Sequence, residues 1–160
     1  MSNAQQIEEL YEKHGGEVLD YLARRCPDGA APDLLQETFL QVVRQKAGLT
    51  GIATPRAWLF GIARHILARH YRQNSVPAFD ARWSGNDPSE RVDPRLSLMR
   101  ESIQQLPPEL RETLGLRLEQ ELSYEDIARV LQIPVGTVRS RLHSALIRLR
   151  AALANQKESS

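Results

Sequence analysis

The sequence has one cysteine, few aromatic residues and no long apolar run. Cys26 has no second cysteine to pair with, which excludes a disulfide-stapled fold and is typical of a reducing compartment. The longest apolar runs are far too short to span a membrane, and residues 1–17 are too polar and acidic for a signal peptide. We therefore expect a soluble, cytoplasmic protein.

Groups that could carry catalysis are also scarce. The four histidines are scattered, and no segment shows metal-ligand spacing or a nucleophile motif. His65 and His70 are five residues apart, so they would not share a helix face well. The sequence therefore predicts no catalytic site, no metal site and no cofactor, and an enzyme is the least favoured class of function.

The two signs of charge are segregated along the chain, although the net charge is only +1. Acids outnumber bases eight to three in residues 1–37 and seven to three in residues 96–126. Residues 38–79 and residues 127–157 each hold six bases and no acid, while residues 80–95 are mixed. A basic stretch without acids attracts a polyanion, and an acidic stretch favours a basic protein surface. The pattern therefore indicates contact with DNA at two places and with protein at others.

Apolar residues recur at helical spacing through most of the chain, which predicts an all-α fold. An N-terminal helix is expected to be interrupted at residues 15–16 and to end near Cys26. Pro32 suits the first turn of a second helix, and a third helix is expected at about residues 56–73. Residues 75–88 lack helical periodicity and are rich in Pro, Gly, Ser and Asp. We therefore expect two small helical domains joined by a flexible linker.

The helix expected at residues 56–73 interleaves bases with aromatic residues. Four residues are expected to pack inward (Leu59, Ile62, Ala63 and Ile66), which leaves Arg64, His65, Arg69 and Arg72 outside. Trp58, Phe60 and Tyr71 lie among these bases. Aromatic and basic side chains together suit unpaired DNA, because every base has a face that can stack. The alternative is that Trp58 and Phe60 fill the small core.

Residues 123–150 read as two short helices joined by a tight turn. Ser123 and Asp126 form a capping-box-like start for the first helix, and Pro134 prevents a single continuous helix. The turn has Gln132 where glycine is common, at a positive φ that costs a non-glycine residue on the order of 1 kcal/mol. This is the layout of a helix-turn-helix, in which one helix braces and the other enters the major groove.

The second of these helices separates an apolar face from a basic one. Apolar residues at spacings of four, three and four are expected to pack inward: Val138, Leu142, Ala145 and Leu149. Four polar residues near the helix start are placed to reach base edges: Arg139, Ser140, His143 and Ser144. Three arginines nearer the flanks suit phosphate contacts: Arg141, Arg148 and Arg150. The alternative is an ordinary helical hairpin with a solvated basic face.

Three segments resemble the extracytoplasmic-function (ECF) group of bacterial sigma factors, the smallest members of the sigma-70 family. Residues 33–39 read DLLQETF, like the part of sigma region 2 that binds the coiled coil of the largest polymerase subunit. Residues 58–64 read WLFGIAR, like the segment that leads into recognition of the −10 promoter element. Residues 123–149 are similar to sigma region 4, which reads the −35 element. All three segments occur in the family's order and spacing.

The resemblance implies both a domain plan and a role. A region 2 bundle of three to four helices would cover residues 1–75, and a four-helix region 4 domain with the helix-turn-helix would cover residues 96–155. Residues 76–95 would be the linker and residues 156–160 a tail. Such a protein is not an enzyme: it binds core RNA polymerase through the coiled coil and the flap and directs promoter-specific transcription initiation. The resemblance also implies a cognate anti-sigma factor.

The candidate site residues fall into three groups under this resemblance. Core polymerase would contact Asp33, Gln36, Glu37 and Gln41. The −10 element would meet Lys46, Trp58, Arg64, His65, Arg69 and Arg72. The −35 element would meet Thr137, Arg139, Ser140, Arg141, His143, Ser144 and Arg148. His65, Arg69 and Ser144 differ from the residues most common in the family, and these positions bear on base preference.

Two other classes of function remain open from the residues alone. A helix-turn-helix regulator with an N-terminal sensing or dimerisation domain would bind duplex DNA without polymerase. A helical interaction protein, such as an anti-sigma factor or an adaptor, would not support promoter-specific initiation. A gel-shift with and without core polymerase separates the regulator from the sigma factor.

Overall fold

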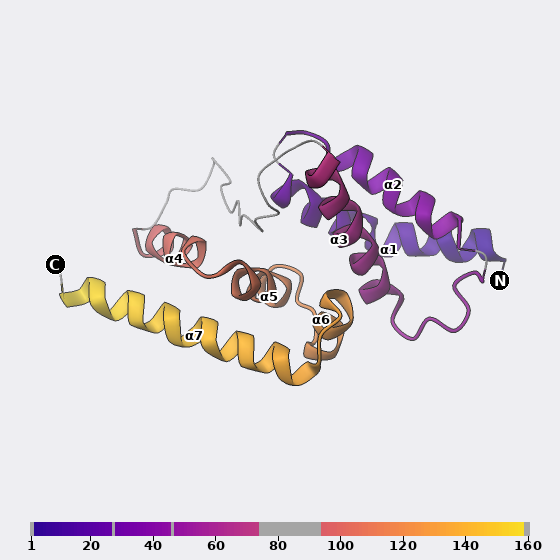
Figure 1. The fold of residues 1–160 in the computed structure, drawn as a ribbon. Helices are drawn as coiled ribbons and strands as arrows, with labels where there is room; N and C mark the ends of the chain where they lie inside the picture. Colours follow the sequence, from indigo (N-terminus) through magenta and orange to yellow (C-terminus); the bar gives the residue numbers. More distant parts are fainter. Residues whose placement is uncertain (1, 27, 46, 74–93, 159–160) are drawn as a thin grey trace. The chain divides into compact units, whose positions relative to one another are not determined.

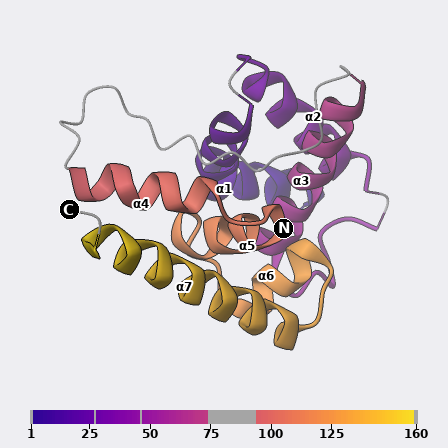
Figure 2. The same ribbon diagram turned by 60° about the vertical axis from the view of Figure 1, so that its left-hand side comes forward.

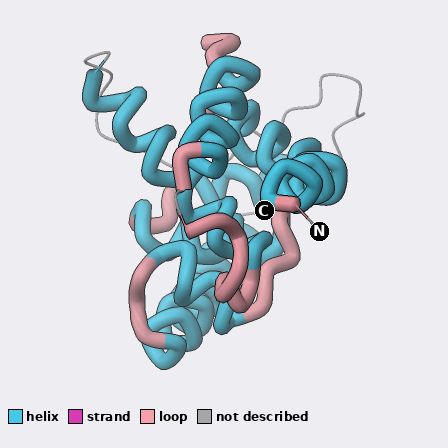
Figure 3. The backbone as a smooth tube through the Cα atoms, turned by 90° about the vertical axis from the view of Figure 1, so that its right-hand side faces the viewer, coloured by secondary structure: helices cyan, strands magenta, loops and turns pink. Residues whose placement is uncertain are grey.

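The computed structural model describes residues 2–26, 28–45, 47–73 and 94–158 (Figure 1). Every regular element in these ranges is a helix, as the tube in Figure 3 shows. The helices are α1 (Asn3–Arg25), α2 (Ala31–Val43), α3 (Pro55–Gln73), α4 (Pro94–Gln104), α5 (Pro108–Leu118), α6 (Tyr124–Leu131) and α7 (Val135–Glu158). The predicted all-α fold is therefore confirmed.

The chain divides into two compact units, the first built on α1–α3 and the second mainly on α4–α7. This confirms the prediction of two small helical domains. Nearly all of the predicted linker, residues 76–95, lies outside the described residues. Helix α7 extends to Glu158, so the first residues of the predicted tail are helical. In the described ranges, no helix is both long and apolar enough to cross a membrane.

Helix α1 has a complete N-terminal cap but not the predicted interruption. The Gln5 backbone N–H donates to Ser2 Oγ at 3.2 Å, and the Ser2 N–H donates to Gln5 Oε1 at 2.9 Å. The helix then runs unbroken through Gly15 and Gly16, so the expected break is wrong. Glycine disfavours a helix interior by only about 1 kcal/mol. The buried face of α1, which includes Val18, outweighs that cost.

The core of the first unit is formed where α1, α2 and α3 pack on one another (Figure 1). Tyr21 of α1 and Phe60 of α3 are fully buried and meet edge to face, with ring centroids 5.5 Å apart. Phe60 therefore fills the core, which agrees with the alternative that these aromatic residues are structural. Trp58 is only partly buried. The Tyr71 hydroxyl donates to the Arg25 carbonyl oxygen and so ties the end of α3 to the end of α1. Tyr71 thus has a structural role.

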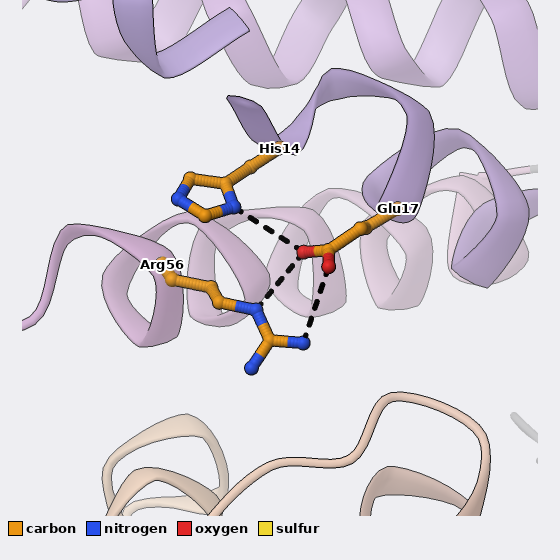
Figure 4. Close-up of polar contacts among 3 residues, drawn as sticks. All are labelled: His14, Glu17 and Arg56. Carbon is orange, nitrogen blue, oxygen red and sulfur yellow. Dashed lines mark hydrogen bonds and ion pairs between the residues drawn. The ribbon is translucent and has the colours of Figure 1, made fainter. Parts of the chain in front are cut away.

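An ion pair ties the start of α3 to the middle of α1 (Figure 4). Arg56 donates through Nε to Glu17 Oε2 at 2.9 Å and through Nη2 to Glu17 Oε1 at 3.4 Å. The His14 Nδ1 atom lies 3.3 Å from Glu17 Oε2. Partial burial raises the pKa of Glu17, but the hydrogen bond and charge of Arg56, with a contribution from His14, outweigh it and lower that pKa below 4.5.

We expect Glu17→Gln to destabilise the first unit at neutral pH by up to about 1 kcal/mol, since the half-exposed pair is screened by water. A lowered folded-state pKa means that the stabilisation is present above pH 4.5 and is lost as the pH falls through the folded-state value. Urea unfolding followed by circular dichroism should therefore show a difference at pH 7 that shrinks in acid. Glu8→Gln changes an exposed acid of the same helix and serves as the control. A difference that persists at low pH would contradict this assignment.

The core of the second unit joins three helices, with α4 and α5 packed along α7 (Figure 2). The buried cluster comprises Ile103, Leu106, Leu110, Ala145 and Leu149. Arg117 of α5 donates to the Leu122 carbonyl oxygen at 3.0 Å and lies over the Tyr124 ring, 5.2 Å from its centroid. These contacts fix the connection that leads into α6.

The helix-turn-helix forms as the sequence predicts. The Asp126 backbone N–H donates to Ser123 Oγ at 3.1 Å, so Ser123 caps α6. Gln132 adopts the expected positive φ, at 55°. Pro134 follows, and its carbonyl oxygen accepts hydrogen bonds from the N–H groups of Thr137 and Val138 at 3.0 and 3.2 Å. The chain therefore stops one helix and restarts another within a few residues.

Candidate functional site

The N-terminal half of α7 presents polar side chains opposite a buried stripe. Val138 and Ala145 are fully buried, as predicted, and anchor this half of the helix. Four of the residues assigned to DNA are exposed: Arg139, Ser140, His143 and Arg148. Three others are half-buried: Thr137, Arg141 and Ser144. All seven therefore retain some contact with solvent. The partial positive charge at the helix N-terminus adds to the attraction for an anion near the first of these residues.

Helix α3 carries a second basic surface, and part of its charge is neutralised. His65 and Arg72 are exposed, while Trp58, Arg64 and Arg69 are half-buried. Arg69 Nη2 lies 3.1 Å from Glu37 Oε2 of α2. The remaining candidate in this group, Lys46, lies outside the described residues.

Helix α2 turns an acidic and amide-bearing side outward. Asp33, Gln36 and Glu37 are exposed, and Gln41 is half-buried. The opposite side carries Leu34 and Val42, which are buried against the rest of the unit. The four candidates for protein contact therefore lie on the outer part of one helix.

Sequence reasoning missed an apolar hollow beside these polar residues. It has a volume of about 320 Å³ and is lined by Tyr11, Leu35, Gln36, Phe39, Leu40 and Val43. Three of the lining side chains are large, apolar and about half exposed: Tyr11 (52%), Leu40 (50%) and Val43 (57%). The available signal was the pair Leu40 and Val43, which fall outside the buried stripe of α2. A contiguous apolar patch on a protein surface is a candidate contact for another protein, a ligand or a membrane.

Two family models match the chain, one in each unit. The model described as "Sigma-70 region 2" matches residues 10–76, which include α2 and α3. The model described as "Sigma-70, region 4" matches residues 96–149, which include α6 and the polar half of α7.

Curated relatives and solved structures agree with these matches. The chain is 36% identical to the RNA polymerase sigma-H factor of Pseudomonas aeruginosa, over 85% of this chain and 80% of that protein. It is 32% identical to the ECF RNA polymerase sigma-E factor of Escherichia coli K12, over 92% of this chain and 84% of that protein.

Among solved structures, the fold resembles the sigma factor RpoE of Bartonella quintana, crystallised with the anti-sigma factor NepR. The TM-score is 0.69 at 22% identity, over 94% of this chain and 98% of that one. It also resembles CnrH in complex with the cytosolic domain of CnrY, with a TM-score of 0.61 at 24% identity, over 95% and 90% of the two chains. With a region 2 match in one helical unit, a region 4 match in the other and relatives that include an ECF sigma-E factor, the chain belongs to the sigma-70 family of RNA polymerase sigma factors, in its ECF group.

Proposed function

We propose that this chain recruits core RNA polymerase to promoters, with α2 docking on the polymerase, α3 meeting the −10 element and α7 reading the −35 element. The observation that carries the proposal is the helix-turn-helix of α6 and α7, with Arg139, Ser140 and His143 exposed on its second helix. As in the family, initiation is promoter-specific. We propose the domain plan that the sequence predicts, with region 2 at residues 1–75, a linker at residues 76–95 and region 4 at residues 96–155.

The assignment of −35 recognition to α7 rests on the geometry of that helix. Arginine binds both acceptors of a guanine in the major groove, and serine donates or accepts according to the base. Arg139 and Ser140 follow directly on the buried Val138, so their backbone is held while their side chains face solvent. Arg148 lies more than two turns further along the helix and suits a phosphate. The assignment therefore divides α7 into a base-reading start and a phosphate-binding flank.

The assignment of −10 recognition to α3 rests on the mixture of basic and aromatic side chains along that helix. Arg72 is exposed and attracts the DNA backbone, and the exposed His65 can form a hydrogen bond to DNA. The partly buried Trp58 offers a ring on which a base can stack. Arg64 adds positive charge, whereas Arg69 is paired with Glu37. Arg69 and Lys46 are assigned to the same contact from the sequence. Unstacking DNA costs a few kcal/mol per step. Binding to the polymerase and to both promoter elements must together supply that free energy.

The polymerase contact rests on the outer face of α2. Asp33, Gln36, Glu37 and Gln41 offer charge and hydrogen bonds to a basic partner, and the apolar hollow next to Gln36 offers area to bury. The same face suits an inhibitor that competes with the polymerase. Of the two solved structures described above, one is a complex with the anti-sigma factor NepR and the other a complex with the cytosolic domain of CnrY. We propose that an anti-sigma factor binds this chain as well.

The chain contributes recognition and leaves the chemistry to the polymerase. Its one cysteine is buried, and burial, with the hydrogen bond and charge of Asp28, raises the pKa of Cys26 to about 11. The thiol is therefore protonated at neutral pH and is a poor nucleophile. We propose that the chain is not an enzyme and that it acts where the genome is transcribed, in the cytoplasm.

In vitro transcription tests the proposal. Purified core polymerase with and without this chain is supplied with fragmented genomic DNA, and the 5′ ends of the transcripts are mapped. We expect start sites that depend on the chain and share two elements at a fixed separation. No chain-dependent start site, or a gel-shift of specific duplex DNA by the chain without polymerase, would overturn the proposal.

Arg148→Ala should weaken holoenzyme binding equally on a promoter and on a fragment with a scrambled −35 element, because a phosphate contact carries no sequence information. The slope of log K against log salt should fall by about 0.9, the value for one lost phosphate contact. The measurement is a salt titration of binding by fluorescence anisotropy. A loss confined to the promoter would contradict the phosphate assignment and place Arg148 among the base-reading residues.

A further inference from the structure

Three ligand-type side chains meet at one corner of the first unit. Cys26 follows the last residue of α1, Asp28 lies in the connection to α2, and His70 lies in the last turn of α3. Their sulfur, carboxylate oxygen and ring nitrogen all lie within 4.8 Å of one another. Cys26 Sγ donates to Asp28 Oδ1 at 2.9 Å, and His70 Nε2 lies 3.4 Å from Asp28 Oδ2. The sequence-based expectation of no metal rested on the scattered histidines and on the lack of metal-ligand spacing in any segment, and it did not foresee this cluster.

We propose that Cys26, Asp28 and His70 form a zinc-binding site. Zinc–sulfur bonds are about 2.3 Å long and zinc–nitrogen and zinc–oxygen bonds about 2.0–2.2 Å, so tetrahedral ligand atoms lie roughly 3.3–3.7 Å apart. The Sγ–Oδ1 distance of 2.9 Å and the Nε2–Oδ2 distance of 3.4 Å involve the two oxygens of Asp28, and one ligand atom from each residue lies within 4.8 Å of the others. Side-chain movements on the order of 1 Å would bring the three ligand atoms to tetrahedral spacing. The exposed Asp28 leaves the fourth position to water.

The donor set selects the class of metal. A thiolate and an imidazole are ligands for zinc and its neighbours in the first transition row, whereas magnesium and calcium take oxygen ligands almost alone. On binding, Zn²⁺ replaces the thiol proton: the S–H bond of Cys26 breaks, a Zn–S bond forms and the proton passes to solvent. No electron is transferred, and no other reactant is needed.

Contacts that do not involve the metal already hold the three residues in place. The Ala30 backbone N–H donates to Asp28 Oδ1 at 3.1 Å and orients the carboxylate. The Tyr71 hydroxyl, next to His70, donates to the carbonyl oxygen of Arg25, next to Cys26. This hydrogen bond between the neighbours of His70 and Cys26 holds the two ligands near each other. A site whose ligands are held before the metal arrives loses less entropy on binding.

Zinc at this position would cross-link α1, the α1–α2 connection and α3. The ends of α1 and α3 are far apart in sequence, so the metal would close a long loop of the unfolded chain and stabilise the first unit. The zinc site is argued from the cluster of Cys26, Asp28 and His70 alone. Failure of zinc binding would leave the proposed function unaffected, and failure of the proposed function would leave the zinc site unaffected.

The test uses the full chain without an affinity tag, reduced and stripped of metal with EDTA. Cobalt(II) is titrated in as a spectroscopic probe for zinc, and absorption is recorded. We expect a thiolate-to-cobalt charge-transfer band that saturates at one equivalent and is abolished by adding Zn²⁺. Cys26→Ser should remove the band, and Asp28→Asn and His70→Gln should each weaken cobalt binding by more than about tenfold. His14→Gln, a matched change in the same unit, should leave it intact.

Thermal unfolding supplies a second readout. Zn²⁺ should raise the melting temperature of the wild-type chain and of His14→Gln but not that of Cys26→Ser or His70→Gln, with circular dichroism showing that each variant is folded. Absence of the charge-transfer band in the wild type would overturn the proposal. So would a band that survives His70→Gln at unchanged affinity, or a melting shift equal in wild type and Cys26→Ser.

Discussion

Glu37→Lys should abolish co-purification of this chain with core RNA polymerase. Glu37 is exposed on the outer face of α2, next to Gln36, which lines the apolar hollow. The substitution places a positive charge where we propose that a basic partner docks. Like charges juxtaposed across an interface cost several kcal/mol, which is a loss of more than about a thousandfold in affinity. The measurement is capture of core polymerase by the immobilised chain, without DNA.

One internal contact of Glu37 must be separated from this effect. Its carboxylate pairs with Arg69 at 3.1 Å, and the side chains of Arg69 and Glu37 are 39% and 47% exposed. An ion pair as exposed as this contributes about 0–1 kcal/mol, too little to explain a complete loss of binding. The double variant Glu37→Lys/Arg69→Glu restores an ion pair of reversed sign. We expect it to fold as well as the wild type and still not to bind polymerase.

The controls make the outcome decisive. Glu8→Lys reverses the charge of an exposed acid on α1 and should bind polymerase normally. Unchanged capture by Glu37→Lys would remove α2 from the polymerase contact. Recovery of capture in the double variant would show that the ion pair, and not the exposed carboxylate, is what binding requires.

The parts of the structure that the sequence predicted are those with local causes. Ser123 caps α6 through a hydrogen bond to a residue three positions away, and Gln132 takes its positive φ because two helices must turn sharply there. The position of Pro32 in the first turn of α2 is likewise set by a single residue. Signals of this kind act within one or two helical turns, so they can be recognised from neighbouring residues in the sequence.

The expectations that failed or were incomplete depend on contacts between distant residues. The break at residues 15–16 does not occur, because tertiary packing of α1 outweighs the weak helix preference of glycine. The segment at 38–79 reads as purely basic, yet Arg56 and Arg69 are paired with acids from earlier in the chain, Glu17 and Glu37. Charge segregation along a sequence does not give the charge of a surface, because helix packing decides which segments meet.

The candidate sites divide in the same way. The polar start of α7 follows from helical periodicity alone, and the structure exposes Arg139 and His143 as that periodicity requires. The apolar hollow beside α2 needs Tyr11 of another helix, so no single segment reveals it. Because every role assigned to these residues in binding DNA or polymerase is a prediction, the test of greatest value is one that distinguishes base reading from simple attraction to DNA.

Arg139→Ala is that test, because it should reduce discrimination for the −35 element by roughly 1–3 kcal/mol, which is about five- to 150-fold. Arg139 is exposed, and its neighbour Val138 is fully buried. Truncating the side chain therefore removes a contact to a base without disturbing the core that positions α7. Circular dichroism and thermal unfolding should match those of the wild type.

The measurement is competition for the holoenzyme between a promoter and a fragment with a scrambled −35 element, at one fixed salt concentration. Arg139→Ala should lose affinity mainly for the promoter, whereas Arg148→Ala should lose equally on both fragments. Arg139→Lys refines the argument, because lysine keeps the charge but lacks the planar fork that engages both acceptors of a guanine. If Arg139 acts by charge alone, Arg139→Lys will behave as the wild type and Arg139→Ala will lose equally on both fragments. Only a base-reading Arg139 gives a large loss in discrimination for both substitutions.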